Sequence, residues 1–172
     1  MADTPNSAEP TGQAAAPPEP PRTFLCVVDQ SEELSQALHW ACRRAVRTKG
    51  RVALLTAIEP PELQHWAAVG NLMKEERRAE AEEMLRVVSA VVQRRTGAMP
   101  MIYIREGNIT DELLKLIEEE RSISLLVLGA STGPEGPGPI VSTLVSKMAG
   151  KLRVPITIVP GSLTDEQIEG VT

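Results

Sequence analysis

Two segments of the sequence carry residue types that can do chemistry. Asp29 directly follows an apolar run, where its carboxylate can accept a hydrogen bond from a ligand or cap a following helix, with Glu32 completing a box-like capping pattern. Residues 129–139 form a glycine- and proline-rich loop before a helical pattern, and a glycine-rich turn at a helix N-terminus can hold an anion. A plain helix cap at Asp29 and a stiff surface loop at 129–139 are the structural alternatives.

The loop departs from the common phosphate-binding patterns. It has no lysine after its last glycine, as a Walker-type loop requires, and its glycines do not follow the G-x-G-x-x-G spacing. Pro134, Pro137 and Pro139 have no N–H to donate, and Glu135 adds a negative charge. Both features weaken the attraction for a phosphate.

No combination of residues indicates catalysis or a metal centre. His39 and His65 have no second His, Cys or carboxylate at metal-ligand spacing, and the sequence contains no G-x-S-x-G elbow. Cys26 and Cys42 lie in apolar segments, which favours buried thiols. We therefore expect a protein that is not an enzyme and that has no metal ligands.

Five short apolar runs alternate with four helical patterns. The runs cover residues 24–28, 52–58, 101–104, 125–128 and 156–159, and most are continuous, which is typical of parallel strands buried on both faces. Gly50 is expected to close the first helix and Asn108 to start the third. The fourth is expected to bury Val141, Leu144, Val145, Met148 and Leu152.

This order predicts an open, doubly wound α/β domain of Rossmann-like type, with five parallel strands flanked by four helices. Ligands bind such sheets at the carboxyl ends of the strands, where the strand order reverses. Asp29 and the loop over 129–139 both fall at such ends.

Composition sets further limits. Residues 1–22 hold six of the 14 prolines and no Leu, Ile, Val or Phe, so we expect a disordered tail, then one domain over 23–161 and a C-terminal extension over 162–172. The net charge of −5 and the four aromatic residues argue against nucleic acid as a partner. Because no apolar run reaches ~20 residues and no secretory signal is evident, we expect no membrane partner and a cytoplasmic location.

Several segments taken together resemble the universal stress protein family. They are Val27-Val28-Asp29, the second run through Glu59, Glu106-Gly107-Asn108-Ile109, the fourth run through Gly129, and residues 154–159. The resemblance spans about residues 23–160. It implies a five-stranded parallel α/β fold and a homodimer that pairs through the last strand.

One branch of that family binds ATP through a G-x2-G-x9-G-[ST] motif. Gly129, preceded by Leu128, matches its first glycine, and the second glycine falls on Thr132, with Gly133 one place late. The third glycine falls on Ser142, and Thr143 takes the hydroxyl position. Asp29 matches an acidic position of the family, and Ala57 falls where a backbone contact to adenine is expected. The resemblance thus implies a nucleotide site formed by Asp29, Ala57, Leu128, Gly129, Gly133, Ser142 and Thr143.

We therefore expect a non-enzymatic stress-response or regulatory module. ATP or AMP would bind weakly, because the sequence offers no Lys or Arg between Gly129 and Lys147 to offset the phosphate charge. The alternative is a homodimeric protein-interaction module on the same fold that has lost nucleotide binding.

Overall fold

The computed structural model describes residues 21–60, 67–148 and 150–172. The tail predicted to be disordered covers residues 1–22, and residues 1–20 of it lie outside the described residues. His65 lies outside them as well. Within the described ranges, no helix is both long and apolar enough to cross a membrane.

Strands and helices alternate along the chain. The strands are β1 (Thr23–Val27), β2 (Arg51–Ile58), β3 (Met101–Glu106), β4 (Ile123–Ala130) and β5 (Ile156–Pro160). The helices are α1 (Leu34–Thr48), α2 (Ala67–Thr96), α3 (Ile109–Glu119), α4 (Pro139–Thr143), which continues as a π-helical turn over Leu144–Met148, and α5 (Asp165–Val171). All strand pairs are parallel, in the order β3-β2-β1-β4-β5. The predicted five-stranded parallel sheet is confirmed, and its order reverses between β1 and β4.

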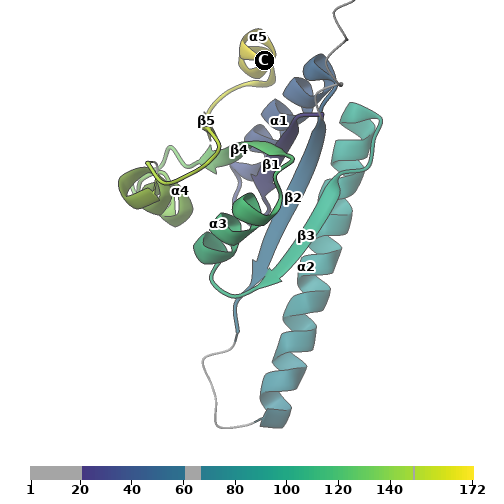
Figure 1. Cartoon of the computed structure of the whole chain (residues 1–172), viewed down its shortest axis with the longest axis vertical. Helices are drawn as coiled ribbons and strands as arrows, with labels where there is room; N and C mark the ends of the chain where they lie inside the picture. The colour runs from purple at the N-terminus through teal and green to yellow at the C-terminus, as the bar shows by residue number, and fades with distance from the viewer. Residues whose placement is uncertain (1–20, 61–66, 149) are drawn as a thin grey trace, which may run out of the picture.

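Helices cover both faces of this sheet (Figure 1), as a doubly wound fold requires. Alternate residues of β1 point to opposite sides: Cys26 packs with α1 and α2, and Leu25 packs with α3 and α4. The outer strands β3 and β5 are exceptions to the expected burial, because Ile102 is 46% and Ile158 is 40% exposed. An edge strand has a neighbour on one side only, which leaves its side chains partly open to water.

Two helix boundaries show how local and tertiary signals differ. Asn108 caps α3 as predicted, since its side-chain oxygen accepts hydrogen bonds from the N–H groups of Thr110 and Asp111. The helix α1 ends just before Gly50, as predicted, and it is the preceding residue, Lys49, that adopts the left-handed conformation, with φ 53°. A side chain does not fit at Gly50, because a Cβ atom there would lie 2.4 Å from the carbonyl oxygen of Arg22.

The helical content differs from the prediction at the C-terminal end of the domain. After α4 the backbone widens into a π-helical turn, and Val145, which was expected to be buried, is 50% exposed. A π-turn shifts the helical phase, so the 3.6-residue pattern read from the sequence no longer selects the inner face. In addition, the extension over 162–172 contains α5, which packs on α1, so the described residues form five α-helices instead of the predicted four.

Candidate functional site

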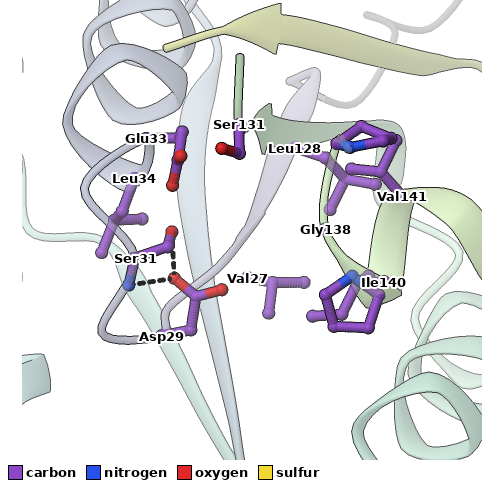
Figure 2. A pocket seen from close by; sticks show the side chains of 13 residues that line it. Val27, Asp29, Ser31, Glu33, Leu34, Leu128, Ser131, Gly138, Ile140 and Val141 are labelled. Atoms are coloured by element: carbon purple, nitrogen blue, oxygen red, sulfur yellow. Dashed lines mark hydrogen bonds between the residues drawn. The ribbon is translucent and has the colours of Figure 1, made fainter. Parts of the chain in front are cut away.

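A pocket of about 100 Å³ lies where β1 and β4 separate, at the carboxyl ends of both strands. One wall carries the polar side chains of Asp29, Ser31, Glu33 and Ser131 together with Leu34, whereas the facing wall is apolar (Figure 2). The apolar wall includes Val27, Leu128, Ile140 and Val141. This is the position at which doubly wound sheets bind their ligands.

Asp29 does not cap α1, so the expected capping box with Glu32 is wrong. Its Oδ1 accepts hydrogen bonds from the backbone N–H of Ser31 at 3.0 Å and from the Ser31 hydroxyl at 2.6 Å. The residue before α1 is Glu33, whose side chain makes no capping hydrogen bond. The Asp29 side chain therefore closes a tight turn of its own backbone, and Figure 2 shows its second carboxylate oxygen directed across the pocket.

Gly129 is required by packing against the start of α1. A Cβ atom at this position would lie 2.6 Å from the carbonyl oxygen and 2.8 Å from the Cβ of Glu33. Gly161, which follows β5, approaches the same residue, since its Cβ would lie 2.6 Å from the Cγ of Glu33. Two glycines from distant parts of the chain thus leave the space that Glu33 occupies.

The other residues singled out in the sequence lie in different places. Leu128 lines the pocket with Asp29 and Gly129, but Ala57 lines a neighbouring hollow of about 340 Å³. The consecutive residues Asp29 and Gln30 border the two hollows, one each. Gly133 is exposed in the loop and is not among the residues that line either hollow.

Ser142 and Thr143 form the last two positions of α4, not its first turn. The backbone N–H of Ser142 donates to the carbonyl of Gly138 at 3.0 Å, and neither residue is among those lining the pocket. The first turn consists of Pro139, Ile140 and Val141, and all three border the pocket. Gly136 and Gly138 have φ of 92° and 96°, so these two glycines allow the backbone conformation of the loop itself.

Part of the charge of the pocket comes from Glu33, a residue that the sequence analysis did not single out. Among the described residues that line it, Asp29 and Glu33 are the ionisable ones, and both are acidic. Glu135, which was expected to repel phosphates, is exposed and does not border the pocket. Glu33 could have been suspected only from its position four residues after Asp29, because its contacts with Gly129 and Gly161 are tertiary.

The remaining reactive side chains are placed for packing. Cys26 and Cys42 are buried free thiols, and burial raises the pKa of Cys42 to about 11 and that of Cys26 further, which disfavours the nucleophilic thiolate. His39 is buried, and its Nδ1 lies 2.8 Å from Asp165 Oδ1. Within the described ranges, no group of three or more His, Cys, Asp or Glu side chains is arranged to hold a metal ion.

The sequence profile of the universal stress protein family matches residues 21–160, which include the pocket and every strand that the structure describes. The chain belongs to this family. The extension that carries α5 lies beyond the matched residues. No curated protein matches the chain in sequence.

Solved structures of universal stress proteins share the fold. UspA from Lactobacillus plantarum is 19% identical, with a TM-score of 0.67 over 80% of this chain and 96% of its own. A family member from Burkholderia pseudomallei is 18% identical, with a TM-score of 0.63 over 84% and 99% of the two chains. The Archaeoglobus fulgidus protein in complex with dAMP is 15% identical, with a TM-score of 0.57 over 79% and 95%. At these identities, the likeness establishes the common architecture.

Proposed function

We propose that this universal stress protein is a non-enzymatic regulatory module that binds an adenine nucleoside or nucleotide weakly where β1 and β4 end. The observation that carries the proposal is the pocket in which Asp29, Leu128 and Gly129 meet. Its partly polar, partly apolar lining suits a ligand that combines sugar hydroxyls with a flat base. The Archaeoglobus fulgidus relative was solved with dAMP, and another universal stress protein was solved with cAMP.

The proposed binding mode assigns the groups of the ligand to the two hollows. Carboxylates only accept hydrogen bonds, so Asp29 suits the hydroxyls of a ribose. The adjoining hollow, lined by Ala57 and Gln30, suits the adenine base. In this mode Ser142 and Thr143 would reach a phosphate only if the loop before α4 rearranged, because neither lines the pocket.

Three features support weak binding. The hollow beside Asp29, which would hold the ribose and any phosphates, measures only about 100 Å³. Pro137 and Pro139 border it without an N–H to donate. The described lining residues include two carboxylates and no positive charge. We further propose that the protein is cytoplasmic. We also propose that it carries out no chemistry on its ligand, because the Ser31 hydroxyl and Asp29 are engaged in a tight turn and the described lining residues include no histidine, lysine or arginine to assist a reaction.

Calorimetry with adenosine, AMP and ATP tests this proposal. Asp29→Asn retains an oxygen for the turn with Ser31 but removes the charge, and we expect it to weaken adenosine binding about tenfold. The matched control is Glu32→Gln, an equal change of charge at an exposed residue outside the pocket lining. Mass spectrometry of small molecules released from freshly purified protein would identify a resident ligand. Equal affinities for the wild type and Asp29→Asn would refute this assignment of the site.

A second candidate function is a homodimeric protein-interaction module without a ligand. It is favoured by β5, an edge strand whose Ile158 is 40% exposed, since open strand edges pair with other chains. Complete absence of binding to adenosine, AMP and ATP, together with a stable dimer in solution, would favour this function over the first.

A further inference from the structure

We infer that Glu33 makes the pocket selective against phosphate, so that adenosine binds more tightly than ATP. This inference rests on the proposed function, because it assumes that an adenine nucleoside occupies the pocket between β1 and β4. It concerns a specificity-determining residue outside the nucleotide motif.

Glu33 is held in place by its surroundings. Its backbone carbonyl and Cβ lie in the space that a side chain on Gly129 would need, and its Cγ lies in the space that a side chain on Gly161 would need. The stem of the side chain is therefore confined between the end of β4 and the end of β5. A carboxylate on a confined stem cannot swing far from an approaching ligand, so its charge acts at a fixed place.

The charge of Glu33 adds to that of Asp29. Both carboxylates belong to the polar wall in Figure 2, and neither forms an ion pair with a described residue. Like charges repel most strongly where little water separates them. Each phosphate added to the nucleoside therefore meets two carboxylates without a basic side chain among the described lining residues.

The same wall is favourable for an uncharged nucleoside. Ribose hydroxyls are donors, and the second oxygen of Asp29 and the carboxylate of Glu33 are acceptors. Ser131 adds a hydroxyl that can both donate and accept. The facing apolar side chains of Val27 and Ile140 need no polar partner. The pocket thus favours the binding of hydroxyl groups and disfavours the binding of phosphates.

Divalent cations provide the strongest competing outcome. Two carboxylates can attract Mg²⁺ together with the phosphates of ATP, and Glu33 would then favour ATP instead of opposing it. Binding must therefore be measured both with Mg²⁺ and with a chelator. If Glu33 repels the phosphates, removing its charge strengthens ATP binding; if Glu33 helps to bind Mg²⁺, removing its charge weakens ATP binding.

The test compares Glu33→Gln with the control Glu32→Gln, which makes the same change of charge at the preceding exposed residue. Calorimetry would measure the affinities of each variant for adenosine and for ATP at constant ionic strength. We expect the wild type to bind adenosine at least about tenfold more tightly than ATP. Glu33→Gln should strengthen ATP binding about five- to tenfold and change adenosine binding less than about twofold, while Glu32→Gln changes neither by more than about twofold. Added salt should strengthen the binding of ATP to the wild type by screening the repulsion.

The outcomes that overturn the inference are distinct from those that overturn the proposed function. An unchanged ratio of ATP to adenosine affinity in Glu33→Gln would show that Glu33 does not select. ATP binding that depends on Mg²⁺ and weakens in Glu33→Gln would reverse the sign of its role. If neither ligand binds any variant, the proposed function fails and the inference fails with it. Thermal unfolding of each variant would show that the near-isosteric glutamine retains the fold.

Discussion

His39 Nδ1 lies 2.8 Å from Asp165 Oδ1, which joins the buried face of α1 to the first turn of α5. Arg44 Nη1 donates to the carbonyl of Thr172 at 3.1 Å, and Ile168 between these contacts is completely buried. These contacts make α5 part of the folded domain, although it lies beyond the residues that match the family.

The first prediction concerns α5. Ile168→Ala should lower the free energy of unfolding by about 2–5 kcal/mol, because it removes a completely buried side chain between α5 and α1. Val171→Ala on the same helix is the control, since Val171 is 67% exposed and should change stability by less than about 0.5 kcal/mol. Urea denaturation measures both. If Ile168→Ala were as stable as Val171→Ala, α5 would not contribute to the packed domain.

The second prediction separates two glycines that the sequence analysis assigned to the nucleotide site. Gly129→Ala should destabilise the protein by about 1–3 kcal/mol, because its Cβ would collide with the backbone of Glu33. Gly133→Ala should be nearly neutral, because its Cβ would meet only the Ser131 hydroxyl oxygen at 3.4 Å. Thermal denaturation of both variants provides the comparison. A stable Gly129→Ala would contradict the tight approach of α1 to β4.

The third prediction concerns the oligomer. We expect a homodimer through β5, and Ile158→Asp should convert it to monomers because a charge would have to be buried at the interface. Sedimentation velocity at tens of micromolar measures the change.

The opposite sheet edge supplies the control for this experiment. Ile102→Asp introduces the same charge on β3, where Ile102 is similarly exposed, and should leave the dimer intact. If Ile102→Asp dissociates the protein and Ile158→Asp does not, the copies pair through β3. A wild type that is monomeric throughout would exclude the dimer.

The fourth prediction follows from the buried thiols. Burial raises the pKa of Cys42 from its ordinary value near 9.0 to about 11, so ionisation favours the unfolded chain as pH rises through this range. The stability that comes from the protonated thiol is complete below pH 9 and is lost by about pH 11. Denaturant unfolding at pH 7.5, 9 and 10.5 should show wild type losing on the order of 2 kcal/mol more than Cys42→Ala. Parallel losses would argue against a buried thiol at this position.

Much of the fold could be predicted because its signals are local. Apolar runs, most of them continuous, marked the five described strands. Asn108 marked the start of α3, where its side chain accepts the capping hydrogen bonds. The helix α5 had a local signal as well, since Thr164 and Gln167 form a capping box. Its single buried residue, Ile168, gave no periodic stripe to draw attention to it.

The site could be predicted only in part because its decisive contacts are not local. The sequence favoured Asp29 as a helix cap, but the backbone N–H and the hydroxyl of Ser31 donate hydrogen bonds to its Oδ1 instead. The importance of Glu33 depends on Gly129 and Gly161, which no spacing rule connects with it. No residue pattern used in the sequence analysis predicted the π-helical turn after α4.

The confinement of Glu33 also connects the pocket with the edge of the sheet. One residue touches the end of β4, which lines the pocket, and Gly161, which directly follows the edge strand β5. We therefore expect a ligand that displaces Glu33 to disturb the edge at which a second copy would pair, and we expect pairing in turn to restrain Glu33. By thermodynamic reciprocity, occupancy of the pocket and self-association would then change each other's equilibrium constants by the same factor.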